Sequence, residues 1–416
     1  MRPQGVHPLY WTGQHYQPPE DWAIKSIKDY ATVVKGKLPS ELFKEPVEGS
    51  LPYLLIDGLG EGETLYTNET HLPTINRSDS VVVADGSRSG LAIRGVQGVL
   101  GSTLLSYRAK YGIDGDFLHY ILESLYSYNN TATIGGAIPH LDKRLLAKLT
   151  LSTPEQKEQG IIAGALKLAD DAINMARNEL NAARILKISL EVELLACKTG
   201  EQGRNKIVSR IFPLKELANI GSGVTLNQDR APKENACRYL TVAHVQRGEI
   251  ANDGDVRFLE LTPRERETRL LKDGDLLVVE GHASSMEIGR AAMFQDKSGE
   301  PTTFQNHLFR VRADKEQILP KFLLYVLNSE RIQRHWNAIC NTSSGLNTIN
   351  RRNLRNLPIQ CPNLDKQRDI IEILDMSKAN IVSIAQKVAA LEEVKRSLLQ
   401  NLLTGKIRIP PTIDIP

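Results

Sequence analysis

The chain has 416 residues, of which 41% are hydrophobic and 24% are charged, and its formal net charge is +3. This composition is typical of a globular protein with two or three domains, and it excludes the disordered and fibrous classes. No stretch approaches the roughly 18 consecutive apolar residues of a membrane span, so we expect no membrane partner.

A nearly neutral charge neither requires nor excludes a polyanionic partner, because nucleic-acid binding depends on a local basic face. The N-terminal segment, residues 1–22, lacks the apolar core of a secretory signal. The cysteines are far apart and form no C-x-x-C pair: Cys197, Cys237, Cys340 and Cys361. We therefore expect reduced thiols, no metal site and a cytoplasmic protein.

The chain contains an internal duplication. Residues 141–198 align without a gap on residues 349–406, and about 15 of the 58 aligned positions are identical. Looser similarity lies upstream, where "DFLHYILES" at Asp116 resembles "KFLLYVLNS" at Lys321. Each half is therefore predicted to contain a variable module followed by a more regular one.

The similarity continues towards the start of each half, where "RSDSVVVADG" at Arg77 parallels "KDGDLLVVEG" at Lys272. We expect an α+β fold with two similar globular modules and two long helices. In chain order, the predicted parts are a globular module over 1–153, a helix over 154–200, a second module over 201–361, a second helix over 362–405 and a tail over 406–416.

Each regular module is predicted to be one long helix, with Pro154 and Pro362 in the first turn, where a missing N–H has no cost. Apolar residues recur at steps of four and three, which is the spacing of a coiled-coil seam. The seam residues are Ile162, Leu166, Ile173, Leu180, Leu190 and Leu194 in the first helix, and Ile370, Leu374, Ile381, Val388, Leu398 and Leu402 in the second. Lys187 and Lys395 occupy the same step of the two seams, so the seam could shift there to the adjoining Leu186 and Val394.

The two helices are expected to pair with each other. An ordinary amphipathic helix packing on its own domain is the alternative, but the pattern lasts for about forty residues, or ~60 Å. A stripe of that length needs a partner of equal length. Two similar heads held by a stiff rod suit a long, periodic ligand such as duplex DNA, which repeats every ~34 Å.

Residues that read bases must be donors or acceptors on loops or helix ends, supported by cations. Segments of this kind occur at corresponding places in both globular modules, although each could be a solvated turn. In the first module the candidates are Ser87, Arg88, Ser89, Asn130, Thr131 and Thr133. In the second they are His282, Ser284, Ser285, Arg290, Gln305, Asn306, Asn341, Thr342 and Ser343.

The sequence argues against catalysis by this chain alone. It contains neither an Asn/Asp-Pro-Pro-aromatic methyltransferase signature nor a G-x-x-x-x-G-K-[ST] phosphate loop. Asp275 and Glu280 in "DLLVVEGH" weakly resemble a nuclease strand, but His282 stands where a lysine is expected. A buried strand with polar ends is the preferred interpretation.

Several motifs together resemble the specificity subunit of type I restriction-modification systems. They are "FQNHLFRVRAD", "ILPKFLLYVLNSERIQRHW" and "LEEVKRSLLQNLLTGKIRI" in the second half, and "PEQKEQGIIAGAL" and "LLACKTG" in the first. The resemblance covers the whole chain and is weakest in the first globular module. It implies that the two helices form an antiparallel coiled coil, whereas the heptads alone would also permit a parallel pair.

The resemblance also implies a split, asymmetric DNA target with one part read by each globular module. The implied partners are double-stranded DNA, two methyltransferase subunits and two motor-nuclease subunits. No cofactor is expected in this chain, because S-adenosylmethionine, ATP and magnesium belong to those partners. Gln159 and Gln367, at matching positions near the helix starts, are candidates for methyltransferase docking.

Two alternatives from other classes remain open. A coiled-coil scaffold with two protein-binding heads would explain the helices without DNA, and a self-sufficient DNA enzyme would explain the DNA-reading loops. Three arginines also have more than one interpretation. They could contact phosphates or a partner subunit, or they could cap the segment that leads into the strand before each long helix. They are Arg144, Arg351 and Arg352.

Overall fold

The computed structural model of the chain describes residues 18–56, 63–126, 141, 150–196, 210–232, 234–251, 257–296, 298–343 and 346–410. The chain divides into two compact units. The first unit contains Met1–Asn178 and Gln386–Pro416, and the second contains Glu179–Ala385.

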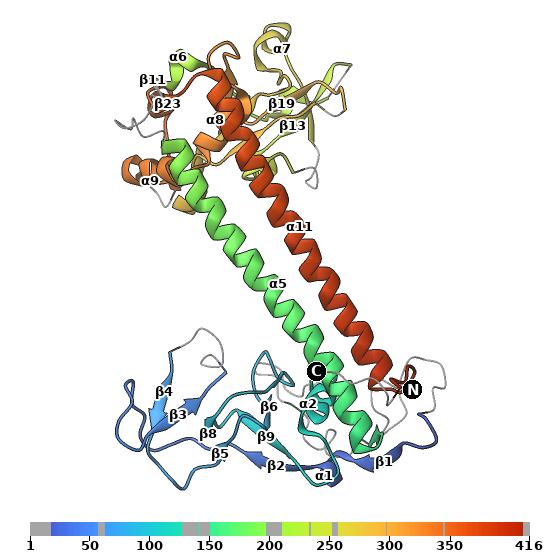
Figure 1. Cartoon of the computed structure of the whole chain (residues 1–416). Helices are drawn as coiled ribbons and strands as arrows, with labels where there is room; N and C mark the ends of the chain where they lie inside the picture. The colour runs from blue at the N-terminus through green and yellow to red at the C-terminus, as the bar shows by residue number, and fades with distance from the viewer. Residues whose placement is uncertain are drawn as a thin grey trace, which may run out of the picture. The chain divides into compact units, whose positions relative to one another are not determined.

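In its described residues, the globular part of the first unit combines short strands with the short helices α1 and α2. In chain order these elements are β1 (Ala23–Ser26), α1 (Ile27–Tyr30), β2 (Ala31–Lys35), β3 (Leu51–Leu54), β4 (Leu65–Thr67), β5 (Thr74–Ile75), β6 (Ser80–Val83), β7 (Ala92–Ile93), β8 (Gly98–Leu100), β9 (Leu104–Ala109), α2 (Gly115–Ser124) and β10 (Thr150–Thr153). The strands form one sheet in the order β2-β9-β6-β7, a second in the order β4-β3-β8-β5, and the pair β1-β10 (Figure 1).

Strand β6 is covered on both faces. All four of its residues are buried. Val82 belongs to an apolar cluster that also contains α2 residues, whereas Val81 and Val83 belong to a second cluster with Leu54 and Leu100. Successive side chains of a strand point to opposite faces, so the unbroken apolar run "VVV" forms a central strand between two cores.

Within the described ranges, the second unit has more elements than the first. In chain order they are β11 (Arg210–Pro213), α6 (Leu214–Leu217), β12 (Ala218–Ser222), η3 (Gln228–Arg230), β13 (Ala236–Leu240), η4 (Val242–His244), β14 (Gly248–Glu249), β15 (Arg257–Glu260), α7 (Pro263–Arg269), β16 (Leu276–Val279), β17 (Gly281–His282), η5 (Ser285–Glu287), β18 (Ala291–Met293), β19 (Thr302–Phe304), β20 (Leu308–Ala313), α8 (Pro320–Leu327), α9 (Glu330–Ile339), β21 (Asn341–Ser343), β22 (Leu346–Thr348), α10 (Arg351–Arg355) and β23 (Pro358–Cys361). Its sheets have the orders β12-β20-β16-β18-β14, β15-β13-β19, β17-β22-β21 and β11-β23.

The two units repeat one topology, because β12-β20-β16-β18 corresponds to β2-β9-β6-β7. In both, an arginine of the neighbouring strand binds an aspartate that precedes the central strand: Arg108 binds Asp79, and Arg312 binds Asp275. These pairs match Asp79 with Asp275, one residue away from the register predicted by placing "RSDSVVVADG" over "KDGDLLVVEG". A run of aliphatic residues fits two registers equally well in the sequence, and the ion pairs together with the bounds of β6 and β16 distinguish them.

The two long helices are α5 (Gln156–Ala196) and α11 (Leu364–Leu402), with 41 and 39 residues. Each begins in one unit and ends in the other. The prediction that Pro154 and Pro362 occupy the first turn is wrong, because both prolines lie two residues before the helix starts. No helix in the described ranges combines the length and the apolar character that a membrane span requires.

The helices pack together in antiparallel orientation, as the family resemblance implied. In the first unit, Ile162 near the start of α5 shares an apolar cluster with Leu402 at the end of α11. In the second unit, Ile370 near the start of α11 shares a cluster with Leu195 at the end of α5. The α+β fold with an internal repeat is therefore confirmed.

The predicted seam residues all lie in protected positions. Those that are buried are Ile162, Leu166, Ile173, Ile370, Leu374, Val388 and Leu402. Those that are half-buried are Leu180, Leu190, Leu194, Ile381 and Leu398. The alternative that the seam shifts by one residue is wrong, because Leu186 is 56% exposed and Val394 is 52% exposed, whereas Lys187 and Lys395 are half-buried.

Candidate nucleic-acid interface

Three segments of the first unit converge where β6 ends. The backbone N–H of Ala84 donates to the carbonyl of Thr103 at 2.7 Å, and the carbonyl of Ala84 accepts from the N–H of Leu141 at 2.8 Å. The predicted turn at residues 85–90 leaves the sheet at this point. Three further candidates, Asn130, Thr131 and Thr133, lie outside the described residues.

The second unit repeats this convergence at the end of β16. The N–H of Glu280 donates to the carbonyl of His307 at 3.1 Å, and the carbonyl of Glu280 accepts from the N–H of Ile349 at 2.9 Å. Three segments chosen from the sequence therefore meet at Glu280: residues 281–290, 305–307 and 341–352. Their spacing along the chain gave no direct sign of this proximity.

Two of these segments share a small sheet. Strand β17 pairs with β22, and β22 pairs with β21, so that His282 lies opposite Asn347 and Asn347 lies opposite Thr342. The backbones of the candidates Asn341, Thr342 and Ser343 are thus one strand away from His282. The side-chain amide of Asn347 fixes the following loop by donating to the carbonyl of Ala283 at 3.0 Å.

The turn after β6 presents some of its candidates and buries another. Ser87 and Arg88 are exposed. Ser89 is 0% exposed, and its hydroxyl donates to the carbonyl of Gly86 at 2.7 Å. Gly86 and Gly90 have φ angles of 107° and 91°, so the turn depends on glycine at both places. The prediction that Ser89 contacts DNA is therefore replaced by a structural role.

The loop that contains Ser284 and Ser285 is anchored from α9. Ser284 is exposed and Ser285 is half-buried. The side-chain amide of Gln333 donates to the carbonyl of Ser285 at 2.8 Å and accepts from Arg247 at 3.0 Å. These bonds hold the loop in place, while the Ser284 side chain is left facing outward.

Arg290 holds the same loop from the inside. The residue is 8% exposed. Its guanidinium donates to the carbonyls of Val245 at 2.7 Å and Val242 at 3.0 Å, and to the Glu287 carboxylate at 2.8 Å. That contact with Arg290 lowers the pKa of Glu287 despite partial desolvation. Each of the three guanidinium nitrogens of this buried residue donates to the protein, so the prediction of a DNA contact is replaced by a structural role.

Gln305 and Asn306 form the turn between β19 and β20. Both are half-buried, and the Gln305 side chain accepts from the N–H of Val242 at 3.3 Å. Beside them, His307 Nδ1 lies 3.6 Å from a carboxylate oxygen of Glu280. Burial raises the pKa of Glu280, and the neighbouring His307 opposes this shift.

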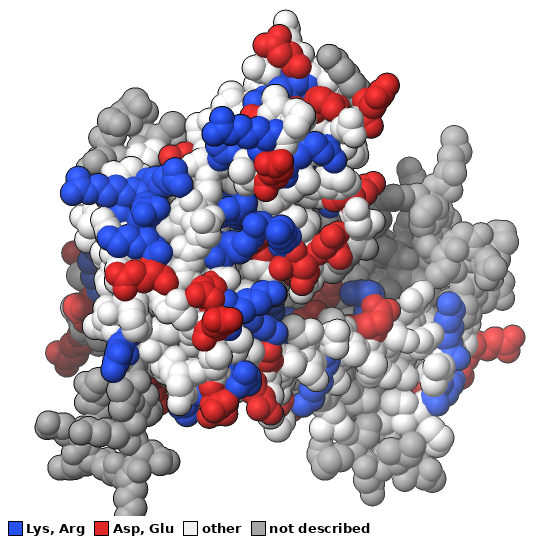
Figure 2. Space-filling model, turned by 90° about the horizontal axis from the view of Figure 1, so that it is seen from above, with Lys and Arg blue, Asp and Glu red and all other residues white. Residues whose placement is uncertain are grey.

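Charge on the visible surface is mixed. Viewed from above, lysine and arginine side chains gather in several groups with acidic side chains between them (Figure 2). Arg351 and Arg352 of α10 are exposed, and Arg351 also donates to the carbonyl of Ile220 at 2.6 Å. Arg144 lies outside the described residues. Among the described residues on this face, the basic groups are separated and form no single continuous patch.

The two glutamines predicted to dock a partner are buried. Gln159 is 1% exposed and Gln367 is 0% exposed. Neither side chain can reach a docked subunit, so that prediction is wrong. Glutamine occupies both positions for a different reason, which is that each side chain forms hydrogen bonds with its globular module.

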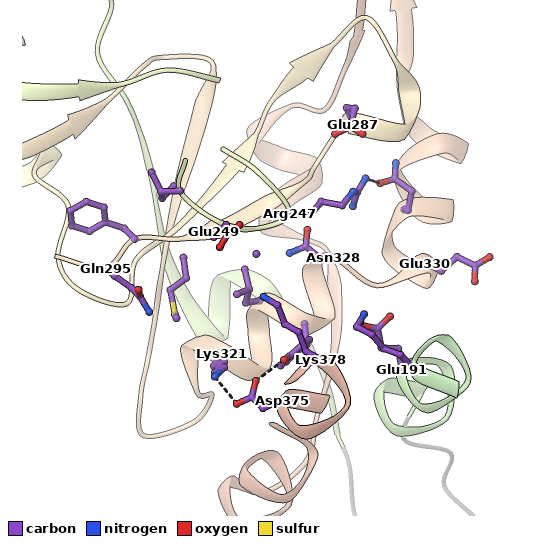
Figure 3. A pocket seen from close by; sticks show the side chains of 18 of the residues that line it. Glu191, Arg247, Glu249, Glu287, Gln295, Lys321, Asn328, Glu330, Asp375 and Lys378 are labelled. Carbon is purple, nitrogen blue, oxygen red and sulfur yellow. Dashed lines mark hydrogen bonds and ion pairs between the residues drawn. The ribbon is translucent and has the colours of Figure 1, made fainter. Parts of the chain in front are cut away.

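A cavity of about 1020 Å³ lies within the second unit (Figure 3). One wall comes from the long helices and α8, with Lys187, Lys321, Asp375 and Lys378, and the other comes from β14 and the end of β18. Lys321 and Asp375 face each other there at 2.6 Å. Among the described residues, no group of three or more His, Cys, Asp or Glu side chains is placed to hold a metal ion.

Comparison with known proteins connects this geometry to a family. Residues 19–183 and 209–393 both match the family described as "Type I restriction modification DNA specificity domain". The MjaVIII type I restriction enzyme specificity subunit of Methanocaldococcus jannaschii is 28% identical over 409 residues, which cover 94% of this chain and 94% of the relative. The EcoKI specificity subunit of Escherichia coli K12 is 21% identical over 425 residues, which cover 94% of this chain and 90% of the relative.

Solved structures of the same class share the fold. The S subunit of a type I restriction-modification system from M. genitalium aligns with a TM-score of 0.53 and 14% identity, covering 92% of this chain and 96% of that one. The HsdS subunit of Thermoanaerobacter tengcongensis aligns with a TM-score of 0.51 and 15% identity, covering 95% of this chain and 100% of that one. The family match spans both halves of the sequence, and the chain therefore belongs to the type I restriction-modification DNA specificity family, as a specificity subunit.

Proposed function

We propose that this subunit reads a bipartite, asymmetric sequence of duplex DNA, with one half-site for each globular module. Residues 1–153 and 201–361 act as the target recognition domains, residues 154–200 and 362–405 as the spacer helices and 406–416 as a tail. The observation that carries the proposal is the repeated convergence of loops at Ala84 and Glu280.

The exposed side chains near these two points suit base recognition. Ser87 and Arg88 in the first unit and Ser284 in the second are donors and acceptors on turns, which is what readout of base edges requires. The two sets differ in residue type, so the two half-sites are expected to differ in sequence. Arg88 and the exposed arginines of α10 can also neutralise phosphates.

The antiparallel coiled coil is proposed to fix the gap between the half-sites. A helix of about forty residues spans ~60 Å, which is comparable to nearly two turns of B-form DNA. Two paired helices resist bending more than one, because every seam residue is fixed by the partner helix. The spacing of the half-sites then follows from helix length and not from DNA sequence.

Partner subunits are proposed to dock on the outer faces of the helices. Leu168 and Met376 occupy matching positions of the duplication and are 48% and 66% exposed. Leu186 and Val394 form a second matching pair, 56% and 52% exposed. Outward apolar residues repeated in both copies suit two equivalent partners.

We assign these outward apolar residues to the docking of two methyltransferase subunits. Two motor-nuclease subunits join them in the restriction complex. Those partners supply the chemistry, with S-adenosylmethionine, ATP and magnesium, so the chain itself holds no cofactor. Such a complex acts where the chromosome lies, in the cytoplasm.

The test is a map of methylated adenines in cells that express the chain with its methyltransferase subunits. A split motif with a constant gap is expected. Replacing residues 1–153 with the corresponding module of another specificity subunit should change one half of that motif and leave the other half and the gap unchanged. A contiguous motif, or a change in both halves, would contradict the proposal.

The scaffold interpretation is tested separately by DNA binding. Phosphate contacts release counterions, so the logarithm of the affinity for duplex DNA should fall linearly with the logarithm of salt concentration, with a slope of about −0.9 for each contact. Heads that bind only protein would show no such slope with duplex DNA.

A further inference from the structure

The side chain of Gln159 joins the first globular module to the start of α5. Its Oε1 accepts a hydrogen bond from the backbone N–H of Asp114 at 2.7 Å. Its Nε2 donates to the carbonyl of Pro154 at 2.8 Å and to that of Gly112 at 3.3 Å. Asp114 is the N-cap of α2, so one buried amide connects the first turn of α5 to the start of the module's own helix.

Gln367 makes the same connection in the second unit. Its Oε1 accepts from the N–H of Leu319 at 2.7 Å, and its Nε2 donates to the carbonyls of Pro362 at 2.8 Å and Gln317 at 2.9 Å. Leu319 is the N-cap of α8, the counterpart of α2. The duplication has thus kept the residue type, its burial and each class of hydrogen-bond partner.

A second link lies further along each long helix. The hydroxyl of Tyr120 on α2 donates to Asp170 of α5 at 2.9 Å, and the hydroxyl of Tyr325 on α8 donates to Asp375 of α11 at 2.7 Å. Two attachment points on one helix prevent the module from rotating about either of them. Each module is therefore held at a defined angle to its spacer helix.

The two joints, which are the attachments of a globular module to its long helix, differ in their ion pairs. In the second unit, Lys321 of α8 lies 2.6 Å from Asp375 of α11. In the first unit, Lys395 of α11 lies 2.5 Å from Glu123 of α2 and 2.6 Å from Asp170 of α5, so it ties three elements together. Lys187 is the matching residue in the second unit, and it pairs at 2.5 Å with Glu191 of its own helix while bordering the cavity of Figure 3. The first joint has an additional connection between the helices.

We propose that Gln159 and Gln367 are positioning residues that set how strictly the subunit selects the gap between its half-sites. The inference rests on the proposed bipartite function and extends it to two residues that cannot touch DNA. Loss of one glutamine lets its module tilt on the spacer helix, so that neighbouring gap lengths become acceptable while the bases read within each half-site stay the same. The effect is larger at Gln367, because Lys395 ties the other module to both long helices, whereas Lys321 pairs only within the two elements that Gln367 already connects.

The experiment uses the full chain in complex with its methyltransferase subunits. Duplexes carry the two half-sites mapped for the wild type, separated by the native gap or by one or two base pairs more or fewer. The measured quantity is the methylation rate on each duplex relative to the native gap. The variants are Gln367→Met and Gln159→Met, which keep side-chain length and remove the hydrogen bonds.

The wild-type complex should methylate the native gap almost exclusively. Gln367→Met should raise the relative rate at one base pair more or fewer by about tenfold, since losing buried hydrogen bonds has an effect of that order. Gln159→Met should raise it less. Arg230→Met is the matched control, because it removes the bidentate pair between Arg230 and Glu265 in the same unit, and neither residue is a hydrogen-bond partner of Gln367. It should leave the relative rates unchanged.

Equal slowing at all gap lengths by Gln367→Met would overturn the inference and leave the glutamine with a folding role only. If that variant does not fold, Gln367→Glu keeps the acceptor for Leu319 and loses the donor, and an unchanged gap preference in it would overturn the inference as well. A wild-type complex without a constant gap would instead overturn the proposed function and the inference together.

Discussion

Arg312 holds the carboxylate of Asp275 through two hydrogen bonds of 2.7 Å each. The Asp275 side chain is 1% exposed and also accepts the backbone N–H of Lys272 at 2.8 Å. In the first unit, Arg108 binds Asp79 in the same way, with bonds of 2.9 and 2.7 Å. Removing the cationic partner of a buried carboxylate strongly destabilises the folded state.

Arg312→Met should therefore lower the free energy of unfolding of the second unit by up to about 3 kcal/mol, reduced from the fully buried case because Arg312 is partly exposed. Asp275→Asn in the same chain should recover part of the loss. Hydrogen exchange by mass spectrometry can follow β16 and β20 separately from the first unit. Unchanged exchange in these strands would show that the pair contributes no stability.

The stability of the first unit should depend on pH through the titration of His119. Burial, followed by repulsion from Arg94 and Lys395, lowers the pKa of His119 to about 4, from an ordinary value of 6.5. Between these values the unfolded chain binds a proton that the folded unit does not. This group therefore makes the first unit progressively less stable as the pH falls from 6.5 towards 4, and it contributes nothing above that window.

His119→Leu is the informative variant, because Leu324 occupies the matching position of the second unit. The wild type and the variant should have similar pH profiles above pH 6.5 and diverge below it, with the variant more resistant to acid. The measurement is denaturant unfolding of the first unit at a series of pH values. Parallel profiles across the window would mean that His119 titrates normally in the folded state.

Local patterns in the sequence predicted the architecture well. The seam of α5 and α11 and the duplication could be identified because periodicity and repeated residues can be recognised in the sequence without knowledge of the fold. The roles of Ser89, Arg290 and Gln159 could not, since each depends on contacts made elsewhere in the fold. Gln159, for example, bonds to Asp114, which is 45 residues away in the chain, and its polar character alone suggested a surface.

The convergence of candidate segments was likewise visible only in three dimensions. His282 and Thr342 are far apart in the sequence, yet they are separated by one strand in the sheet. The preference for a buried strand at residues 275–282 over a nuclease site agrees with the burial of β16. The Asp275 carboxylate is bound by Arg312 through both oxygens. Asp275 and Glu280 therefore do not form a pair of free carboxylates.

Arg88 should affect one half of the DNA target. Arg88→Ala removes an exposed cation from the turn of the first unit and should weaken recognition of the first half-site by about 1–3 kcal/mol, the loss expected for one base contact. Lys44→Ala is the control, because it removes an exposed cation of the same unit that lies outside the turn. Competition binding with duplexes altered in either half-site distinguishes them. Equal loss on both half-sites would exclude a local role for Arg88.

Arg408 should stabilise the ends of the first unit. Its guanidinium binds Asp21 at 3.0 and 3.1 Å and Glu158 at 2.6 and 2.7 Å. Arg408→Lys keeps the charge but cannot form both bidentate pairs. Faster hydrogen exchange is expected at residues 18–26 and 403–410, with no change in the second unit. Exchange as slow as in the wild type would show that charge alone suffices.

The central claim is that the paired helices set the gap, and it is tested most directly by lengthening them. Seven residues inserted after Asn178 in α5 and seven after Ala385 in α11 keep the heptad register of both seams. At 1.5 Å per residue the insertion adds ~10 Å, or about three base pairs of DNA. Mapping methylated adenines with this variant should give both original half-sites separated by a gap about three base pairs longer. Methylation that retains the original gap would contradict the account.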